Sequence, residues 1–138
     1  MDGHTIQRLT AERAQEFPAT TVEHPFGPDW DVFKVRDKIF MVHTELQGVP
    51  IVNPKATPDD CHRLRSTYSQ ITPGYHMNKK HWITVRPGDQ IEESLVQDLV
   101  TDSYLLVIEN NLPKKAWPVN PATFAQRELS GISNEEKP

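Results

Sequence analysis

One segment of the sequence gathers side chains that suit contact with a polyanion. Residues 74–82 read Gly-Tyr-His-Met-Asn-Lys-Lys-His-Trp. Phosphate oxygens could be bound by its two lysines and two imidazoles, which are Lys79, Lys80, His76 and His81. The amide of Asn78 can both donate and accept a hydrogen bond, which suits a positioning role. The rings of Tyr75 and Trp82 would either stack on bases or hold the segment in its conformation.

The same residues also fit ordinary structural roles. In that interpretation Met77 and Trp82 belong to the core, the two lysines are solvated charges at the end of a strand, and Asn78 caps a turn. The segment is expected to be ordered in either case, because Tyr75, Met77 and Trp82 are large side chains that need something to pack against. Residue types alone leave the two interpretations open.

The chain is acidic overall, yet its middle part is basic. It carries 15 Lys and Arg against 19 Asp and Glu, a net charge of −4, which excludes a uniformly basic protein that coats nucleic acids. Residues 55–86 hold six basic and two acidic side chains, a net charge of +4. Contact with DNA is therefore expected to be confined to this part. Beyond the 74–82 segment, the cations expected to contribute are Arg63, Arg65 and, further away, Lys34 and Lys38.

Three helices are predicted from apolar residues at helical spacing, over residues 5–17, 58–68 and 90–110. Thr57 followed by Pro58 is typical of a helix N-terminus, and Asp89 is the expected N-cap of the third helix. The single cysteine, Cys61, falls on the apolar side of the second helix and is expected to be a small buried filler. Since the chain has no second cysteine, it cannot form an intramolecular disulfide.

Four strands are predicted from alternating or β-branched runs, at residues 30–35, 39–44, 49–53 and 82–85. The first two form a hairpin, and the third extends it into an antiparallel meander. Pro50 and Pro54 bracket the third strand, which suits an edge or a strand end better than the centre of a sheet. Pro73 and Gly74 predict a type II turn with a positive φ at the glycine. The connection of residues 70–80 is longer than usual, which is typical of a functional loop.

No constellation for catalysis or metal binding stands out in the sequence. His76 and His81 lie five residues apart, not at the i, i+4 spacing that brings two imidazoles together on a helix. The first helix offers only Glu12 and Glu16 as acids, too few to bind hard cations. The sequence has neither a glycine-rich phosphate loop nor a Gly-x-Ser-x-Gly motif. We therefore expect a protein that uses no metal or cofactor and is not an enzyme.

Length and hydropathy predict one domain in the cytoplasm. The 138 residues suit a single domain, which we assign to residues 1–117. Residues 118–138 are acidic and contain prolines, so we expect a tail that is loosely docked or disordered. The apolar runs are far too short to span a membrane, and no secretory signal is visible. We expect the protein to be a monomer.

The 74–82 segment, followed by Thr84 and Val85, resembles the signature of the YjbR/MmcQ family of small bacterial proteins. Other stretches that are similar to this family are residues 25–28, 32–35, 38–41 and 99–106. The resemblance extends over about residues 4–113 and implies a CyaY-like α+β fold, in which helices pack on one face of an antiparallel sheet. Proteins of this family are described as DNA-binding proteins with a double-wing motif.

Two functions follow as hypotheses. The first is a non-enzymatic protein that binds DNA through residues 55–86, with the 74–82 segment at the centre of the contact. The residues expected to form this contact are Arg63, Arg65, Tyr75, His76, Asn78, Lys79, Lys80, His81 and Trp82. The alternative is a pocket protein that binds a small anionic ligand or a protein partner, with the same segment as a lid.

Overall fold

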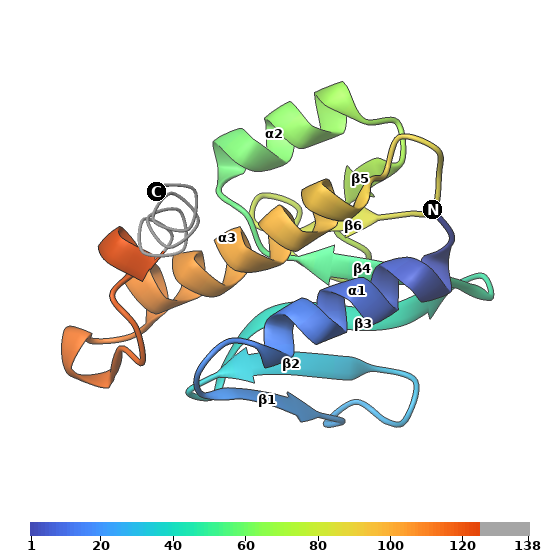
Figure 1. Cartoon of the computed structure of the whole chain (residues 1–138). Coiled ribbons are helices and arrows are strands. Elements are labelled where there is room, and N and C mark those ends of the chain that lie inside the picture. Colours follow the sequence, from blue (N-terminus) through green and yellow to red (C-terminus); the bar gives the residue numbers. More distant parts are fainter. Residues whose placement is uncertain (125–138) are drawn as a thin grey trace, which may run out of the picture.

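A single antiparallel sheet forms the centre of the computed structural model, which describes residues 1–124 (Figure 1). Its strands are β1 (Thr20–Glu23), β2 (Asp31–Val35), β3 (Lys38–Leu46), β4 (Val49–Pro54), β5 (Ile71–Pro73) and β6 (Ile83–Val85). Their spatial order is β1-β2-β3-β4-β6-β5, and every neighbouring pair is antiparallel. The first four strands therefore form a meander, and the last two add a second hairpin beside β4.

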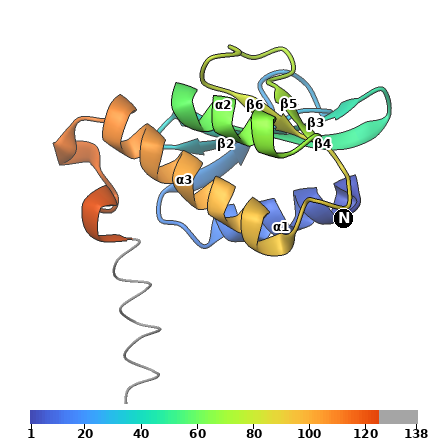
Figure 2. The same cartoon turned by 90° about the horizontal axis from the view of Figure 1, so that it is seen from above.

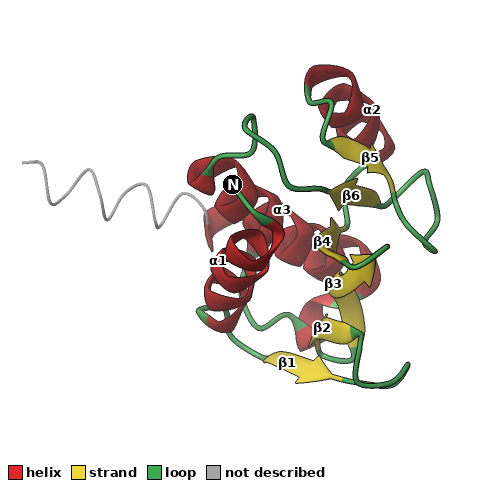
Figure 3. Cartoon of the chain, turned by 90° about the vertical axis from the view of Figure 1, so that its right-hand side faces the viewer, coloured by secondary structure: helices red, strands yellow, loops and turns green. Residues whose placement is uncertain are grey.

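Three α-helices accompany the sheet: α1 (Gly3–Gln15), α2 (Pro58–Thr67) and α3 (Glu93–Asn111). A short 3-10 helix, η1 (Lys114–Ala116), follows α3. Helices α1 and α3 pack against each other and cover the same face of the sheet, whereas α2 lies against β5 at one edge (Figure 3). This arrangement confirms the predicted α+β class with helices on one face.

The helix-covered face of the sheet holds the main hydrophobic core. The ring of Phe40 in β3 lies 5.6 Å from the ring of Tyr104 in α3. Tyr104 also stacks on Phe17 at 4.6 Å, and its hydroxyl donates a 2.6 Å hydrogen bond to the carbonyl oxygen of Pro18. Burial of this phenol raises the pKa of Tyr104 to about 12. These contacts fix α3 and the end of α1 on one side of the sheet.

The other face of the sheet is covered by loops rather than helices. Val32, Val42 and Ile51 are at most 1% exposed, yet they lie outside the main core because side chains alternate between the faces of a strand. The connections of residues 24–30 and 74–82 lie over this second face, on the side away from α1 (Figure 2). Both faces of the sheet are therefore shielded from water.

The β2–β3 hairpin has the predicted short turn. Arg36 and Asp37 both have positive φ angles, of 48° and 68°, as in a two-residue type I′ turn. Of the two positions expected for the third predicted strand, the edge is wrong, because β4 lies between β3 and β6. Its prolines do lie near the strand ends, with Pro50 second and Pro54 last. Its prolines are compatible with that place since β6 pairs with β4 at Val52, between Pro50 and Pro54.

The second and third helices differ in how closely they match their predicted starts. Thr57 caps α2 as expected, accepting a 3.1 Å hydrogen bond from the backbone N–H of Asp60. Helix α3 begins at Glu93, so the expected N-cap at Asp89 is wrong. The backbone N–H of Ile91 donates to the carbonyl oxygen of Gly88 at 3.3 Å. This turn delays the start of the helix.

Two strands were not predicted, and the predicted tail could be compared with the structure only in part. The strands β1 and β5, of four and three residues, were not expected from the sequence pattern. The predicted tail at residues 118–138 lies mostly outside the described residues. Within them, the ring of Phe124 lies 5.8 Å from the ring of Phe17, in an edge-to-face contact.

Candidate nucleic-acid interface

The 74–82 segment connects β5 to β6 as a loop held by its own hydrogen bonds. The N–H of Gly74 donates to the carbonyl oxygen of Trp82 at 3.0 Å, and the N–H of Trp82 donates to that of Asn78, also at 3.0 Å. The side-chain oxygen of Asn78 accepts from the N–H of Lys80 at 2.8 Å. Asn78 thus caps the turn, as in the structural interpretation of the sequence.

Gly74 has a different role from the one predicted. Its φ is not positive, so the expected type II turn at Pro73 and Gly74 is wrong. A Cβ atom at Gly74 would lie 2.7 Å from the Cβ of Trp82, closer than side chains pack. The glycine is therefore needed for the close approach of the two ends of the loop. The left-handed conformation falls instead on His76, with a φ of 57°.

A buried polar network attaches this loop to the second face of the sheet. The Thr84 hydroxyl donates to the side-chain oxygen of Asn53 at 2.6 Å and accepts from the N–H of Tyr75 at 2.8 Å. The side-chain amide of Asn53 donates to the carbonyl oxygen of Tyr75 at 3.3 Å. Asn53 and Thr84 are fully buried, so these bonds compensate for their lost hydration. The sequence pattern gave no signal for this network.

Four cations belong to the loop or contact it, and we call Lys55, Arg65, Lys79 and Lys80 the basic corner. Arg65 on α2 donates from its guanidinium to the carbonyl oxygen of Lys79 at 3.3 Å. The ammonium of Lys79 donates to the carbonyl oxygen of Gly74. Lys55 follows β4, and its ammonium lies 5.8 Å from the ring centre of Trp82. Partial burial lowers the pKa of Lys55. The exposed imidazoles of His76 and His81 belong to the same loop.

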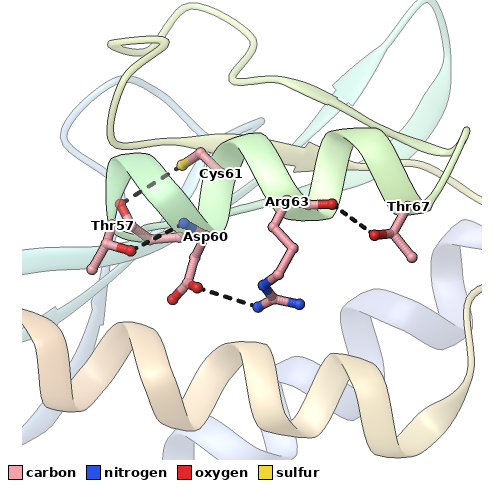
Figure 4. Close-up of polar contacts among 6 residues, drawn as sticks. Thr57, Asp60, Cys61, Arg63 and Thr67 are labelled. Atoms are coloured by element: carbon pink, nitrogen blue, oxygen red, sulfur yellow. Dashed lines mark hydrogen bonds and ion pairs between the residues drawn. The ribbon is translucent and has the colours of Figure 1, made fainter.

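Three of the expected cations lie elsewhere or are already paired. Arg63 points toward α3 and forms a 3.2 Å ion pair with Asp60, which lies on α2 as well (Figure 4). Lys34 forms a 3.1 Å ion pair with Glu23 across β1 and β2. Lys38 lies at the start of β3, beside the β2–β3 turn. Of the two arginines predicted on α2, only Arg65 therefore belongs to the basic corner. Lys55 also belongs to it, and sequence reasoning missed this residue although it lies in the basic part of the chain.

Trp82 and Tyr75 differ in their exposure. Trp82 is only 8% exposed, so its ring serves to hold the loop and leaves little surface for a base. Tyr75 is half-buried and belongs to a series of rings that we call the aromatic row: Phe26, Trp30, Tyr75 and His76. Phe26 and Trp30 come from the 24–30 connection, which the fold brings beside the 74–82 segment although the two are far apart in the sequence. Sequence reasoning did not identify Phe26 or Trp30 as site residues.

A cavity of about 360 Å³ lies between α2 and α3, away from the 74–82 segment. Its charged lining consists of Lys55, Arg63, Asp60, Asp102 and Glu109. Burial and the nearby carboxylates of Asp98 and Asp60 raise the pKa of Asp102. No residue of the 74–82 segment lines this cavity. His81 of the segment lines a second cavity, of about 250 Å³, together with Lys55 and Asn111.

The described part of the chain has neither a cluster of metal-binding side chains nor a helix suited to crossing a membrane. Within residues 1–124, no three His, Cys, Asp or Glu side chains converge as a metal site would require. In the same residues, no helix combines the length and hydropathy needed to cross a membrane.

Comparison with known sequences yields a family and several bacterial relatives. A family model described as YjbR matches residues 15–106, which include the basic corner and the aromatic row. The Escherichia coli O157:H7 protein YbdF, described as uncharacterized, is 43% identical over 121 residues, covering 88% of this chain and 99% of that protein. The uncharacterized protein YjbR of Escherichia coli K12 is 34% identical over 89 residues, covering 63% of this chain and 75% of that one.

Solved structures share the fold described above. A Deinococcus radiodurans protein with a DUF419 domain matches with a TM-score of 0.73 and 29% identity, covering 84% of this chain and 86% of that one. A Pseudomonas syringae protein matches with a TM-score of 0.63 and 29% identity, covering 72% of this chain and 96% of that one.

Proposed function

The chain belongs to the YjbR family, and we propose that it binds DNA, without catalysing a reaction, through the basic corner beside the 74–82 segment. One observation carries this proposal. Lys55, Arg65, Lys79 and Lys80 come from three separate parts of the chain and belong to or contact the 74–82 segment, and no carboxylate of residues 1–124 forms an ion pair with them. By contrast, Arg8, Lys34 and Arg63 are each paired with an acid. The corner therefore has positive charge available for phosphates.

Phosphate contact suits the way these cations are presented. Arg65 and Lys79 each donate one hydrogen bond to a carbonyl oxygen of the loop. This bond orders the side chain, and the remaining donors of each cation stay available to a ligand. Binding of this kind releases counterions from the DNA and is independent of sequence. The acidic remainder of the chain keeps other surfaces away from the backbone of the nucleic acid.

The test is a fluorescence-anisotropy titration of a random-sequence duplex at several salt concentrations. If three or four phosphates are neutralised, the logarithm of affinity should fall with the logarithm of salt with a slope of about −3 to −4, from roughly −0.9 per phosphate. The double variant Lys79→Ala/Lys80→Ala should bind more weakly and reduce the steepness of the slope by about two units.

The matched control is Lys114→Ala/Lys115→Ala, which removes two adjacent lysines from η1 and should leave affinity and slope nearly unchanged. Equal effects of the two double variants would refute the assignment to the basic corner. No binding of the duplex or of a single strand by the wild-type protein below about 1 mM at low salt would refute DNA binding itself.

A second candidate function is the binding of a small molecule in the cavity between α2 and α3. Its volume, about 360 Å³, falls in the range typical of ligand sites. The lining carries three carboxylates against Lys55 and Arg63, so a ligand with both charges fits better than the anion expected from the sequence. Thermal stabilisation by a library of zwitterionic metabolites would support this candidate, and its loss in Asp102→Asn would place the ligand there.

A further inference from the structure

The aromatic row is a partly exposed surface that the basic corner does not explain. Phe26 is 63% exposed, an unusual position for such a large apolar side chain. Its ring meets Trp30 edge to face at 6.3 Å, and Trp30 lies parallel to Tyr75 within 5° at 6.4 Å. His76 lies beside both of these rings, 4.1 Å from Tyr75 and 6.2 Å from Trp30 between ring centres. Four rings from two connections thus lie side by side on the second face of the sheet.

Both connections that carry the row are fixed to the sheet before any ligand arrives. In the 24–30 connection, the Thr44 hydroxyl donates to the carbonyl oxygen of Asp29 at 3.1 Å, and His24 lies 2.8 Å from Asp31. In the other connection, the buried pair Asn53 and Thr84 holds the backbone of Tyr75. The rings therefore lose little conformational entropy when a flat ligand stacks on them.

We propose that the nucleic acid bound by this protein is single-stranded, with bases stacked on the aromatic row and phosphates held by the basic corner. This inference rests on the proposed function. In a duplex the faces of the bases are covered by their neighbours, so an exposed row of rings can be used only by unstacked bases. The two halves of the site are adjacent, because Tyr75 and His76 belong to the same loop as Lys79 and Lys80.

The distribution of charge determines on which side of this surface the sugar-phosphate backbone lies. In the 24–30 connection and directly after it, the acids Asp29 and Asp31 flank Trp30, and Asp31 already pairs with His24. On the Tyr75 side the nearby charges are the lysines of the loop. The sugar-phosphate backbone is therefore placed along the 74–82 segment, and the bases project from it toward Trp30 and Phe26.

The test compares an oligothymidylate of about 16 nucleotides with a duplex of the same length by fluorescence anisotropy. Phe26→Ala should weaken binding of the single strand between about fivefold and 100-fold, the usual effect of removing one stacking ring, and leave duplex binding unchanged. Phe26→Leu should weaken it to a similar extent, because leucine keeps apolar bulk but has no ring face. The salt slope should stay the same in both variants, since no cation is lost.

The control is Val49→Ala, which trims another exposed apolar side chain, at the β3–β4 turn. It should leave both affinities unchanged. Equal binding of single strand and duplex by the wild type, or no selective loss in Phe26→Ala, would overturn the single-strand inference while leaving DNA binding intact. Failure of the wild type to bind either probe would overturn both. Because Phe26 is largely exposed, its replacement should not impair folding, which circular dichroism will verify.

Discussion

The guanidinium of Arg65 on α2 donates a hydrogen bond to the carbonyl oxygen of Lys79, in the loop between β5 and β6. Arg63, two residues earlier on the same helix, points toward α3 and pairs with Asp60. Successive residues of a helix are rotated by about 100°, so these two arginines face nearly opposite directions. One of them therefore belongs to the basic corner and the other to the cavity between α2 and α3.

This division predicts different effects of removing the two arginines. Arg65→Ala should weaken duplex binding and flatten the salt slope by about one unit, because one cation near the phosphates is lost. Arg63→Ala, with the same change in net charge, should leave both quantities nearly unchanged. Anisotropy titrations at several salt concentrations measure the difference, and a similar loss in both variants would contradict the division.

The Thr84 hydroxyl predicts a stability effect centred on the loop. Thr84→Val keeps the shape of the side chain but leaves the Asn53 oxygen and the Tyr75 N–H without their partner, which should cost about 1–3 kcal/mol of unfolding free energy. Urea denaturation measures the loss. The control is Thr72→Val on β5, a half-exposed position that pairs with Thr84 and should change stability by less than about 0.5 kcal/mol. Hydrogen exchange at the Tyr75 amide should accelerate only in Thr84→Val.

Burial of His43 predicts a dependence of stability on pH. Its Nε2 lies 2.8 Å from the Thr10 hydroxyl, its ring packs on Phe33, and burial lowers its pKa from 6.5 to about 3. Above pH 6.5 the residue is neutral in both states and contributes no pH dependence. Between pH 6.5 and about 3 the unfolded chain binds a proton that the folded chain does not, so stability falls as the pH falls.

The size of this effect follows from the pKa difference. At pH 5, the His43 contribution should lower the unfolding free energy by about 2 kcal/mol, at about 1.4 kcal/mol per pH unit below 6.5. Urea denaturation at pH 7 and pH 5 measures the total change, to which other groups also contribute. His43→Gln does not titrate and should remove this part of the change. An identical pH dependence in the variant would refute the assignment.

The environment of Cys61 predicts an unreactive thiol. The side chain is 1% exposed, its Sγ lies 3.7 Å from the carbonyl oxygen of Ala56, and burial raises its pKa. Since the thiolate is the nucleophile, the folded protein should react with a disulfide reagent at least about 100-fold more slowly than the urea-unfolded chain. Comparable rates in the two states would show that α2 opens readily.

Much of the fold could be predicted because it depends on local patterns. Apolar periodicity gave α1 and α2, the Thr57 cap gave the start of α2, and alternation gave the β2–β3 hairpin. The strands β1 and β5 lack a recognisable run such as the aromatic and β-branched residues that predicted β6, and they owe their conformation to pairing with β2 and β6. The misplaced β4 shows the same limit, since a proline excludes only the hydrogen bond of its own nitrogen.

The candidate site could be predicted only where it is continuous in sequence. The 74–82 segment was identified from its own residues, and Arg65 was included because it lies in the basic part of the chain, residues 55–86. Phe26, Trp30 and Lys55 come to it from other connections, because the fold brings those connections together over one face and edge of the sheet. The opposite directions of Arg63 and Arg65, however, follow from helix geometry and were accessible in principle.

The two outermost strands have a consequence for the behaviour of the protein at high concentration. An exposed strand edge can pair with another molecule and start edge-to-edge aggregation. Here β1 has four residues, and β5 has three, ends at Pro73 and packs against α2. Neither edge offers a long run of free backbone groups to an incoming strand. The short edges therefore disfavour pairing of the sheet with a second molecule. The aromatic row then stays available to a ligand.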